Sequence, residues 1–192
     1  MASNLKETNS PGTRTIVITG GASGIGKATA LLCAARGDSI AVLDTNADAA
    51  KTVAEEALRN GARDALGMAC DVTVEERVEE SFTSISARFG APYGLFANAG
   101  IGLRGFIHEL PAEDWRQVIE TNLTGVFLSC KHGLRHMMAA KIPGSIVCTS
   151  SPTGFVALGA GAVGAYSAAK GGISALVHCM AIDYAAYGIR VN

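Results

Sequence analysis

Short, continuous runs of apolar residues alternate along the chain with segments in which apolar positions recur every three or four residues. The runs are typical of strands buried on both faces of a sheet and span 15–19, 39–44, 65–72, 93–98, 144–149 and 189–192. The other segments have the spacing of amphipathic helices and span 25–36, 48–60, 73–89, 111–140 and 166–187. This alternation predicts right-handed crossovers and an α/β fold, with a doubly wound parallel sheet covered on both faces.

Local signals mark the ends of several of these elements. Gly37 and Gly61 follow the first two predicted helices, and glycine is a common residue just after a helix. Thr73 and Glu76 have the spacing of a capping box, in which two side chains bind the free N–H groups at a helix start. Thr73 is therefore the expected N-cap of the third helix.

The length of the chain fits a single domain. With 192 residues the chain can build one full-sized core but not two. Residues 1–14 are polar and predict a tail without a signal peptide, and residues 15–192 predict the domain. Because a core strand opens at Ile189 and the sequence stops at Asn192, we expect the domain to be incomplete at its C-terminus.

Charge and cysteine content narrow the class of protein. A net charge of -1 gives no bulk attraction to nucleic acid or to an anionic membrane, so the expected partners are small molecules and further copies of the chain. The five cysteines are scattered without a Cys-x-x-Cys pair, which indicates reduced thiols. The stretch 153–182 is weakly charged but consists largely of Gly and Ala and contains Lys170, so no membrane span is expected. These features predict a cytoplasmic protein.

A glycine-rich loop lies between the first strand and the first helix. Gly20, Gly24 and Gly26 follow G-x-x-x-G-x-G, a variant of the dinucleotide fingerprint, in which backbone N–H groups and the helix dipole hold a pyrophosphate. The stretch from Gly21 to Lys27 also fits G-x-x-x-x-G-K, the loop of P-loop phosphotransferases. Ala28 stands where that class needs a magnesium-binding hydroxyl. The phosphotransferase remains an alternative to the dinucleotide-binding protein.

Asp44 ends the second strand and follows Gly26, the last glycine of the loop, by 18 residues. This is close to the spacing of about 20 residues at which an acid binds the adenosine ribose. A carboxylate there would repel a 2′-phosphate, and no Lys or Arg follows Asp44 before Lys51. The pattern favours NAD over NADP. The alternative is that Asp44 only closes a turn.

Tyr166 and Lys170 are four residues apart on the last predicted helix, so their side chains lie on one face. A free phenol has a pKa of about 10, and lowering it to about 7 takes roughly 4 kcal/mol. One ammonium group at about 4 Å supplies an interaction of that order at an effective dielectric constant near 20. The pair is therefore a candidate for proton transfer, and the alternative is a core tyrosine beside a solvated lysine.

These features together resemble the short-chain dehydrogenase/reductase family, from about Thr15 to the last residue. The motifs that carry the resemblance are Thr19-Gly-x-x-x-Gly-Ile-Gly26, Asp71-Val72, Asn98-Ala-Gly100, Asn122, Thr149-Ser-Ser151, Tyr166-x-x-x-Lys170 and Ile189-Arg-Val-Asn192. The resemblance implies a Rossmann-like single domain and an oxidoreductase that transfers a hydride between NAD(H) and a secondary alcohol or ketone. It also implies a homodimer or homotetramer that pairs through the helices holding Asn122 and Tyr166.

The resemblance also implies roles for particular residues. Tyr166 would act as acid and base toward the substrate oxygen, and Lys170 would support Tyr166 and bind the nicotinamide ribose. Ser151, rather than Ser150, would hold the substrate oxygen. Asn122 would interrupt its helix and hold a water that relays protons. The cofactor-binding residues implied are Gly20, Ser23, Gly24, Ile25, Gly26, Asp44, Asp71, Val72, Asn98, Tyr166 and Lys170.

The sequence also permits a protein without catalytic activity and raises the question of a metal site. A non-catalytic nucleotide-binding module would keep the same motifs without turning over a substrate. His132 and His136 have a spacing that could bind a metal, but no acid of the H-E-x-x-H type accompanies them, and Lys131 and Arg135 would repel a cation. We therefore predict no metal site.

Overall fold

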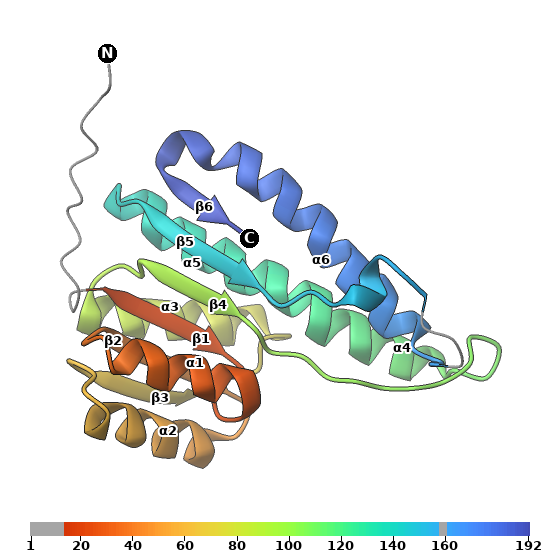
Figure 1. The fold of residues 1–192 in the computed structure, drawn as a ribbon, viewed down its shortest axis with the longest axis horizontal. Coiled ribbons are helices and arrows are strands. Elements are labelled where there is room, and N and C mark those ends of the chain that lie inside the picture. Colours follow the sequence, from red (N-terminus) through yellow and green to blue (C-terminus); the bar gives the residue numbers. More distant parts are fainter. Residues whose placement is uncertain (1–13, 158–160) are drawn as a thin grey trace.

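The computed structural model of the chain describes residues 14–157 and 161–192. These residues form a six-stranded sheet in the order β3-β2-β1-β4-β5-β6, and every pair of neighbouring strands is parallel (Figure 1). The strands are β1 (Thr15–Thr19), β2 (Ser39–Asp44), β3 (Ala65–Ala69), β4 (Gly94–Ala97), β5 (Gly144–Cys148) and β6 (Ile189–Val191). The predicted doubly wound α/β fold is confirmed. Its strand order reverses between β1 and β4, which is where such sheets form a ligand crevice.

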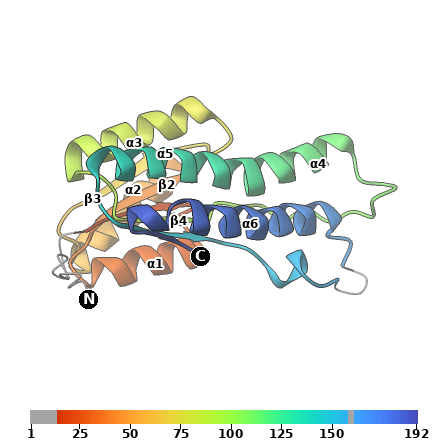
Figure 2. The ribbon, with the colours of Figure 1, turned by 90° about the horizontal axis from the view of Figure 1, so that it is seen from above.

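Helices cover both faces of the sheet (Figure 2). They are α1 (Gly24–Ala34), α2 (Ala47–Arg59), α3 (Glu75–Phe89), α4 (Ala112–Ile119), α5 (Gly125–Ala140) and α6 (Gly164–Asp183), with a π-helical turn η1 (Glu120–Thr124) and the 3-10 turns η2 (Pro152–Gly154) and η3 (Ala185–Tyr187). Helices α3, α5 and α6 pack on one face, and α1 and α2 pack on the other. Within the described residues no helix is both long enough and apolar enough to cross a membrane.

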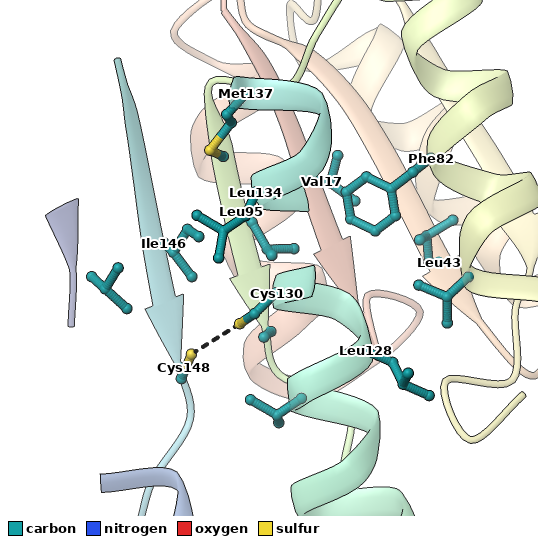
Figure 3. Packing of buried hydrophobic residues seen from close by; sticks show 14 of the residues in the cluster. Val17, Leu43, Phe82, Leu95, Leu128, Cys130, Leu134, Met137, Ile146 and Cys148 are labelled. Carbon is teal, nitrogen blue, oxygen red and sulfur yellow. Dashed lines mark hydrogen bonds between the residues drawn. The ribbon is translucent and has the colours of Figure 1, made fainter. Parts of the chain in front are cut away.

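Successive residues of the central strands face opposite cores. Val17 and Leu43 belong to the larger cluster, under α3, α5 and α6, whereas Ile18 and Val42 belong to the smaller one under α1 and α2. This two-sided burial is why the strands read as continuous apolar runs. Figure 3 shows the larger cluster, in which side chains of α3 and α5 interlock with those of the strands and the sulfur atoms of Cys130 and Cys148 lie 3.7 Å apart.

Two sequence predictions about helices need correction. The capping box is wrong: the N-cap of α3 is Val74 without a side-chain bond, because the N–H and hydroxyl groups of Thr73 bind Asp71 Oδ1 instead. The continuous helix that periodicity predicts over 111–140 is divided by the π turn η1, which contains Asn122, where the family resemblance implied an interruption. One widened turn leaves the apolar spacing on either side unchanged, so periodicity alone cannot detect it.

The chain enters the sheet through a buried ion pair. The guanidinium of Arg14 binds the carboxylate of Asp38 through two hydrogen bonds of 2.9 Å, and the Asp38 side chain is 0% exposed. Of the predicted polar tail, only Arg14 belongs to the described residues.

Candidate active site

A cleft of about 690 Å³, here called the large cleft, lies at the carboxyl ends of β1 to β4. Its lining includes most of the residues that the sequence assigned to a cofactor: Gly20, Ser23, Gly24, Ile25, Asp44, Asp71, Val72 and Asn98. Gly26 is not part of that lining. The large cleft therefore coincides with the crevice that the strand order predicts.

Gly24 and Gly26 serve the loop in different ways. A Cβ atom at Gly26 would collide with the Gly20 carbonyl oxygen, so Gly26 lets α1 start directly against the end of β1. Gly24 has a φ of +51°, and a Cβ there would meet nothing within 4 Å. The backbone at Gly24 faces open space at the first turn of α1, where a phosphate group fits the free N–H groups of a helix start.

The Asp44 carboxylate supports the glycine loop and also lines the large cleft. Oδ2 accepts a hydrogen bond from the Ala22 N–H, and Oδ1 accepts one from the Asn46 N–H, both at 3.1 Å. Asp44 therefore closes the turn that follows β2, and its bond to the adenosine ribose stays a prediction. A carboxylate offers about four acceptor positions, so these two bonds leave room for ribose hydroxyl groups.

Thr19 and Asn98 join the ends of three strands beneath the large cleft. Thr19 Oγ1 accepts hydrogen bonds from the backbone of Asn98 and Ala99, at 3.0 and 3.2 Å. The Asn98 amide donates back to the carbonyls of Thr19 and Gly20 and accepts a bond from Thr149 Oγ1 at 3.0 Å. In this structure the amide of Asn98 thus holds the strand ends in place.

The phosphotransferase alternative finds no support in the geometry of Lys27. Its ammonium group binds the Glu56 carboxylate of α2 at 2.8 Å. A P-loop lysine instead has to reach the phosphates, and here the side chain is drawn toward the neighbouring helix.

A second cavity of about 380 Å³, here called the small cavity, adjoins the large cleft at Asn98, Gly100 and Ile101. Tyr166, Lys170 and Asn122 line it. Lys170 Nζ lies 5.4 Å from the centre of the Tyr166 ring, as the spacing of the two residues on one helix face predicts. The structure therefore brings this pair to the edge of the predicted cofactor site.

Lys170 is not a solvated lysine. It is 2% exposed, and its ammonium group donates a 2.6 Å hydrogen bond to the Thr149 carbonyl oxygen. Burial lowers the pKa of Lys170 from its usual value, because removal from water disfavours the charged form. The helix thus holds a desolvated cation beside a phenol.

Asn122 lies in the π turn and is 0% exposed. Its amide forms a pair of 2.9 Å hydrogen bonds with the backbone of Ile101, accepting from the N–H and donating to the carbonyl. The predicted interruption of the helix at Asn122 is present. The side chain fixes the loop after β4 to the start of α5, and the proton-relaying water stays a prediction.

The two serines after β5 differ in their hydrogen bonds. Ser150 Oγ donates to the Lys170 carbonyl oxygen at 3.0 Å and lies 2.9 Å from Ser174 Oγ, so it is directed into α6. Ser151 Oγ accepts from the N–H and the hydroxyl of Thr153, at 3.3 and 3.0 Å. Both of these bonds use lone pairs of Ser151 and leave its own proton to donate. Neither serine is in the described lining of the small cavity, and the choice of Ser151 over Ser150 stays a prediction.

The two histidines of α5 have partners within the protein. His132 Nε2 lies 3.2 Å from Glu75 Oε1, and His136 Nδ1 lies 2.8 Å from Ser86 Oγ. Residues 14–157 and 161–192 contain no group of three or more His, Cys, Asp or Glu side chains arranged to hold a metal.

The sequence assigned no role to several residues around the two cavities. Thr19 and Thr149, which were named only as parts of motifs, support Asn98, while Ile101, Leu103, Arg104 and Val163 line the small cavity. Thr19 could have been given a role as a polar residue at the end of an apolar strand. The others lie on loops, whose contacts across the chain leave no periodic signal.

The comparisons with known proteins agree with this geometry. The sequence model for the short chain dehydrogenase family matches residues 14–192. A cis-4-hydroxycyclohexanecarboxylate dehydrogenase of Sinomonas cyclohexanicum is 47% identical over 93% of this chain and 70% of its own length. A cyclohexanol dehydrogenase of an Acinetobacter strain is 40% identical over 92% of this chain and 69% of its own length.

A solved structure supports the same assignment. The crystal structure of an NAD⁺-bound xylitol dehydrogenase superposes with a TM-score of 0.89 at 36% identity, covering 96% of this chain and 70% of the other. A doubly wound sheet with a glycine-rich first turn is the arrangement of a dinucleotide-binding fold. The chain belongs to the short-chain dehydrogenase family.

Proposed function

We propose that this chain is an NAD-dependent dehydrogenase that interconverts a ring-bearing secondary alcohol and its ketone. The observation that carries the proposal is the Tyr166–Lys170 pair, held in the small cavity directly beside the large cleft. Relatives named for cyclohexane-ring alcohols support the substrate class, and the NAD⁺-bound relative supports the nicotinamide cofactor.

The large cleft suits a dinucleotide. Free N–H groups at the start of α1 would hold the pyrophosphate, and Asp44 would bind the adenosine ribose. Asp71 and Val72 would meet the adenine. No Lys or Arg lines the described part of the cleft, and the Asp44 carboxylate would repel a 2′-phosphate, so NAD is proposed over NADP. When bound, the cofactor supplies hydride acceptance and donation.

Tyr166 and Lys170 of the small cavity, together with Ser151, which is not part of the described lining, would transfer the proton and bind the substrate oxygen. The Tyr166 hydroxyl would accept the proton of the substrate alcohol in the oxidative direction and return it in the reductive one. The buried Lys170 ammonium would keep a positive charge beside the Tyr166 ring during this transfer. The free proton of Ser151 would donate to the substrate oxygen and stabilise the charge that develops there.

Assembly and location stay predictions. A homodimer or homotetramer through the helices that hold Asn122 and Tyr166 is supported by large apolar side chains exposed on these helices, among them Trp115, Phe127 and Ile182. Light scattering of the purified protein would measure the assembly. A cytoplasmic location is expected for an NAD-linked enzyme of this class.

The replacement Tyr166→Phe tests the proposed function. We expect the wild type to reduce NAD with cyclic secondary alcohols, and the variant to lose about 10²–10⁴-fold in kcat because the acid/base group is gone. NAD affinity, measured by calorimetry, should stay within severalfold. Tyr187→Phe is the matched control, since Tyr187 is an exposed tyrosine and should keep full activity.

Other outcomes would favour the alternatives. Protein that binds NAD but oxidises no alcohol would be a nucleotide-binding module. Magnesium-dependent binding of ATP in place of NAD would support the alternative that the chain is a phosphotransferase. Full activity in Tyr166→Phe would show that the Tyr166 hydroxyl does not act as the acid and base.

A further inference from the structure

Arg104 lies on the loop after β4 and lines the small cavity together with Tyr166 and Lys170. The backbone beside it is fixed: the Gly105 N–H donates a 2.8 Å hydrogen bond to the Ala162 carbonyl oxygen, and Gly105 pairs with Val163 as an isolated bridge. This contact ties the Arg104 loop to the segment that enters α6. Because Arg104 is also exposed, it lies where the small cavity opens to solvent.

The small cavity has a one-sided charge. Its described lining contains Lys170 and Arg104 and no carboxylate. The Lys170 ammonium is already bound to the Thr149 carbonyl oxygen. Within residues 14–157 and 161–192 Arg104 forms no ion pair, whereas Arg14, Arg77 and Arg88 each bind a carboxylate.

The carboxylate nearest to Arg104 in the sequence is that of Glu109, on the same loop. Glu109 Oε1 lies 3.5 Å from His108 Nε2. The fork of the Arg104 guanidinium, which stays charged throughout the working pH range, is therefore open to a ligand.

The lining also includes apolar side chains. Ile101, Leu103 and Val163 supply them, while Asn98 and Thr149 are polar residues that directly follow β4 and β5. A ligand that matches this lining has a hydroxyl or carbonyl group for Tyr166, a hydrocarbon body for the apolar side chains and an anionic group for Arg104. A carboxylate suits Arg104, since guanidinium binds it through two parallel hydrogen bonds.

We propose that Arg104 binds a carboxylate of the substrate, and that the substrates are ring-bearing hydroxy acids and the corresponding oxo acids. The inference rests on the proposed function, because it places the reacting oxygen at Tyr166. Arg104 would determine specificity and orient the ring without taking part in hydride or proton transfer.

The test compares a charged substrate with a neutral one of the same shape. We would measure NAD-dependent oxidation of 4-hydroxycyclohexanecarboxylate and of its carboxamide by the wild type, Arg104→Gln, Arg104→Lys and Arg59→Gln. A hydrogen-bonded charge pair is worth about tenfold or more in binding. The wild type should therefore prefer the carboxylate by about tenfold, and Arg104→Gln should lose that preference mainly through a higher KM.

The controls separate a specific role from general damage. Arg104→Gln should change kcat/KM for the carboxamide by less than about twofold, since that substrate has no charge to lose. Arg104→Lys should recover part of the preference, because the charge returns without the planar fork. Arg59, an exposed residue at the end of α2, should be replaceable without effect.

A binding measurement gives a readout that does not depend on turnover. Cyclohexanecarboxylate, which has no hydroxyl group to oxidise, should bind the wild type with NAD present and bind Arg104→Gln about tenfold more weakly. Added salt should weaken the binding of cyclohexanecarboxylate to the wild type and leave its binding to Arg104→Gln unchanged.

The outcomes are distinct for the two proposals. Oxidation of the carboxamide without a preference for the carboxylate would overturn the role of Arg104 and leave the proposed function intact. An equal loss for both substrates in Arg104→Gln would do the same. If no alcohol at all reduces NAD, the proposed function fails and this inference fails with it.

Discussion

The large cleft is built from strand ends, whereas the small cavity is built mainly from loops. Around the large cleft, hydrogen bonds of Thr19 and Asn98 join β1, β4 and the residue after β5. The outer wall of the small cavity comes from 101–104 and Val163, joined through one isolated bridge at Gly105. A sheet fixes the first site with many cooperative contacts, and loops can vary the second without disturbing the sheet.

The two hollows also differ in charge. The described lining of the large cleft contains Asp44, Asp71 and Glu120 but no Lys or Arg, and that of the small cavity contains Lys170 and Arg104 but no acid. In the proposed function, the large cleft would therefore use backbone N–H groups to hold phosphates. The small cavity instead has side-chain cations in its lining. Each of the following predictions changes one hollow and leaves the other as a reference.

After Tyr166→Phe, the largest effect is expected at the two serines that follow β5, Ser150 and Ser151. Ser151→Ala removes the proposed donor to the substrate oxygen and should lower kcat by about 10²–10³-fold, while NAD affinity, set in the large cleft, stays unchanged. Ser150→Ala should instead cost about 1 kcal/mol of stability, because Ser150 bonds to α6. Kinetics and thermal unfolding of both variants measure this contrast, and the reverse pattern would assign the role to Ser150.

A smaller effect is expected at Asp44, on the side of the large cleft. Asp44→Ala removes the proposed bonds to the adenosine ribose and the repulsion of a 2′-phosphate, so the preference for NAD over NADP should narrow by about tenfold. The loop bond from Ala22 is lost as well, but that loss affects both cofactors alike and cancels in the ratio.

The matched control for this change is Asp48→Ala. Asp48 is almost fully exposed on α2, with a side chain 96% exposed, and the variant should leave the ratio unchanged. Steady-state kinetics with each cofactor gives the ratio. An equal change in both variants would show that the Asp44 carboxylate does not discriminate between the cofactors.

The sequence predicted the large cleft better than the small cavity for a physical reason. Strand ends follow from apolar runs, and parallel strands bring their carboxyl ends to one edge, so Gly20, Asp44 and Asn98 could be grouped from their positions alone. The Tyr166–Lys170 pair followed from helical spacing within one element. Both are local patterns, and the structure places these residues as expected.

The remaining features depend on contacts between distant segments. The bonds of the Asn122 amide to Ile101 and the pairing of Gly105 with Val163 each join segments that share no local pattern. The prediction of a capping box failed for a related reason. Asp71 competes as an acceptor for the Thr73 hydroxyl, and the spacing of Thr73 and Glu76 carries no information about that competition. Arg104 was overlooked because a single charged residue on a loop has no motif.

The smallest expected effect is on stability, and it concerns the buried charge between the two hollows. Burial lowers the pKa of Lys170 in the folded protein below its usual value. The charged form is therefore disfavoured by folding, and this cost is fully present below the lowered pKa. It is relieved as the pH rises from that pKa toward the unfolded value of about 10.4.

Lys170→Met removes this titration, so the difference in Tm between the variant and the wild type should depend on pH. The Tm of the variant relative to that of the wild type should be highest near neutral pH. This difference should decrease toward pH 10, as the buried Lys170 ammonium of the wild type loses its proton. The lost bond to the Thr149 carbonyl shifts the difference by a constant amount, which leaves the slope unaffected. Lys51→Met, at an exposed lysine, should give a difference that is flat over the same range. A Tm difference for Lys170→Met that does not change with pH would mean that the Lys170 ammonium reaches water in solution. The contrast between a buried cation in the small cavity and solvated acids in the large cleft would then no longer hold.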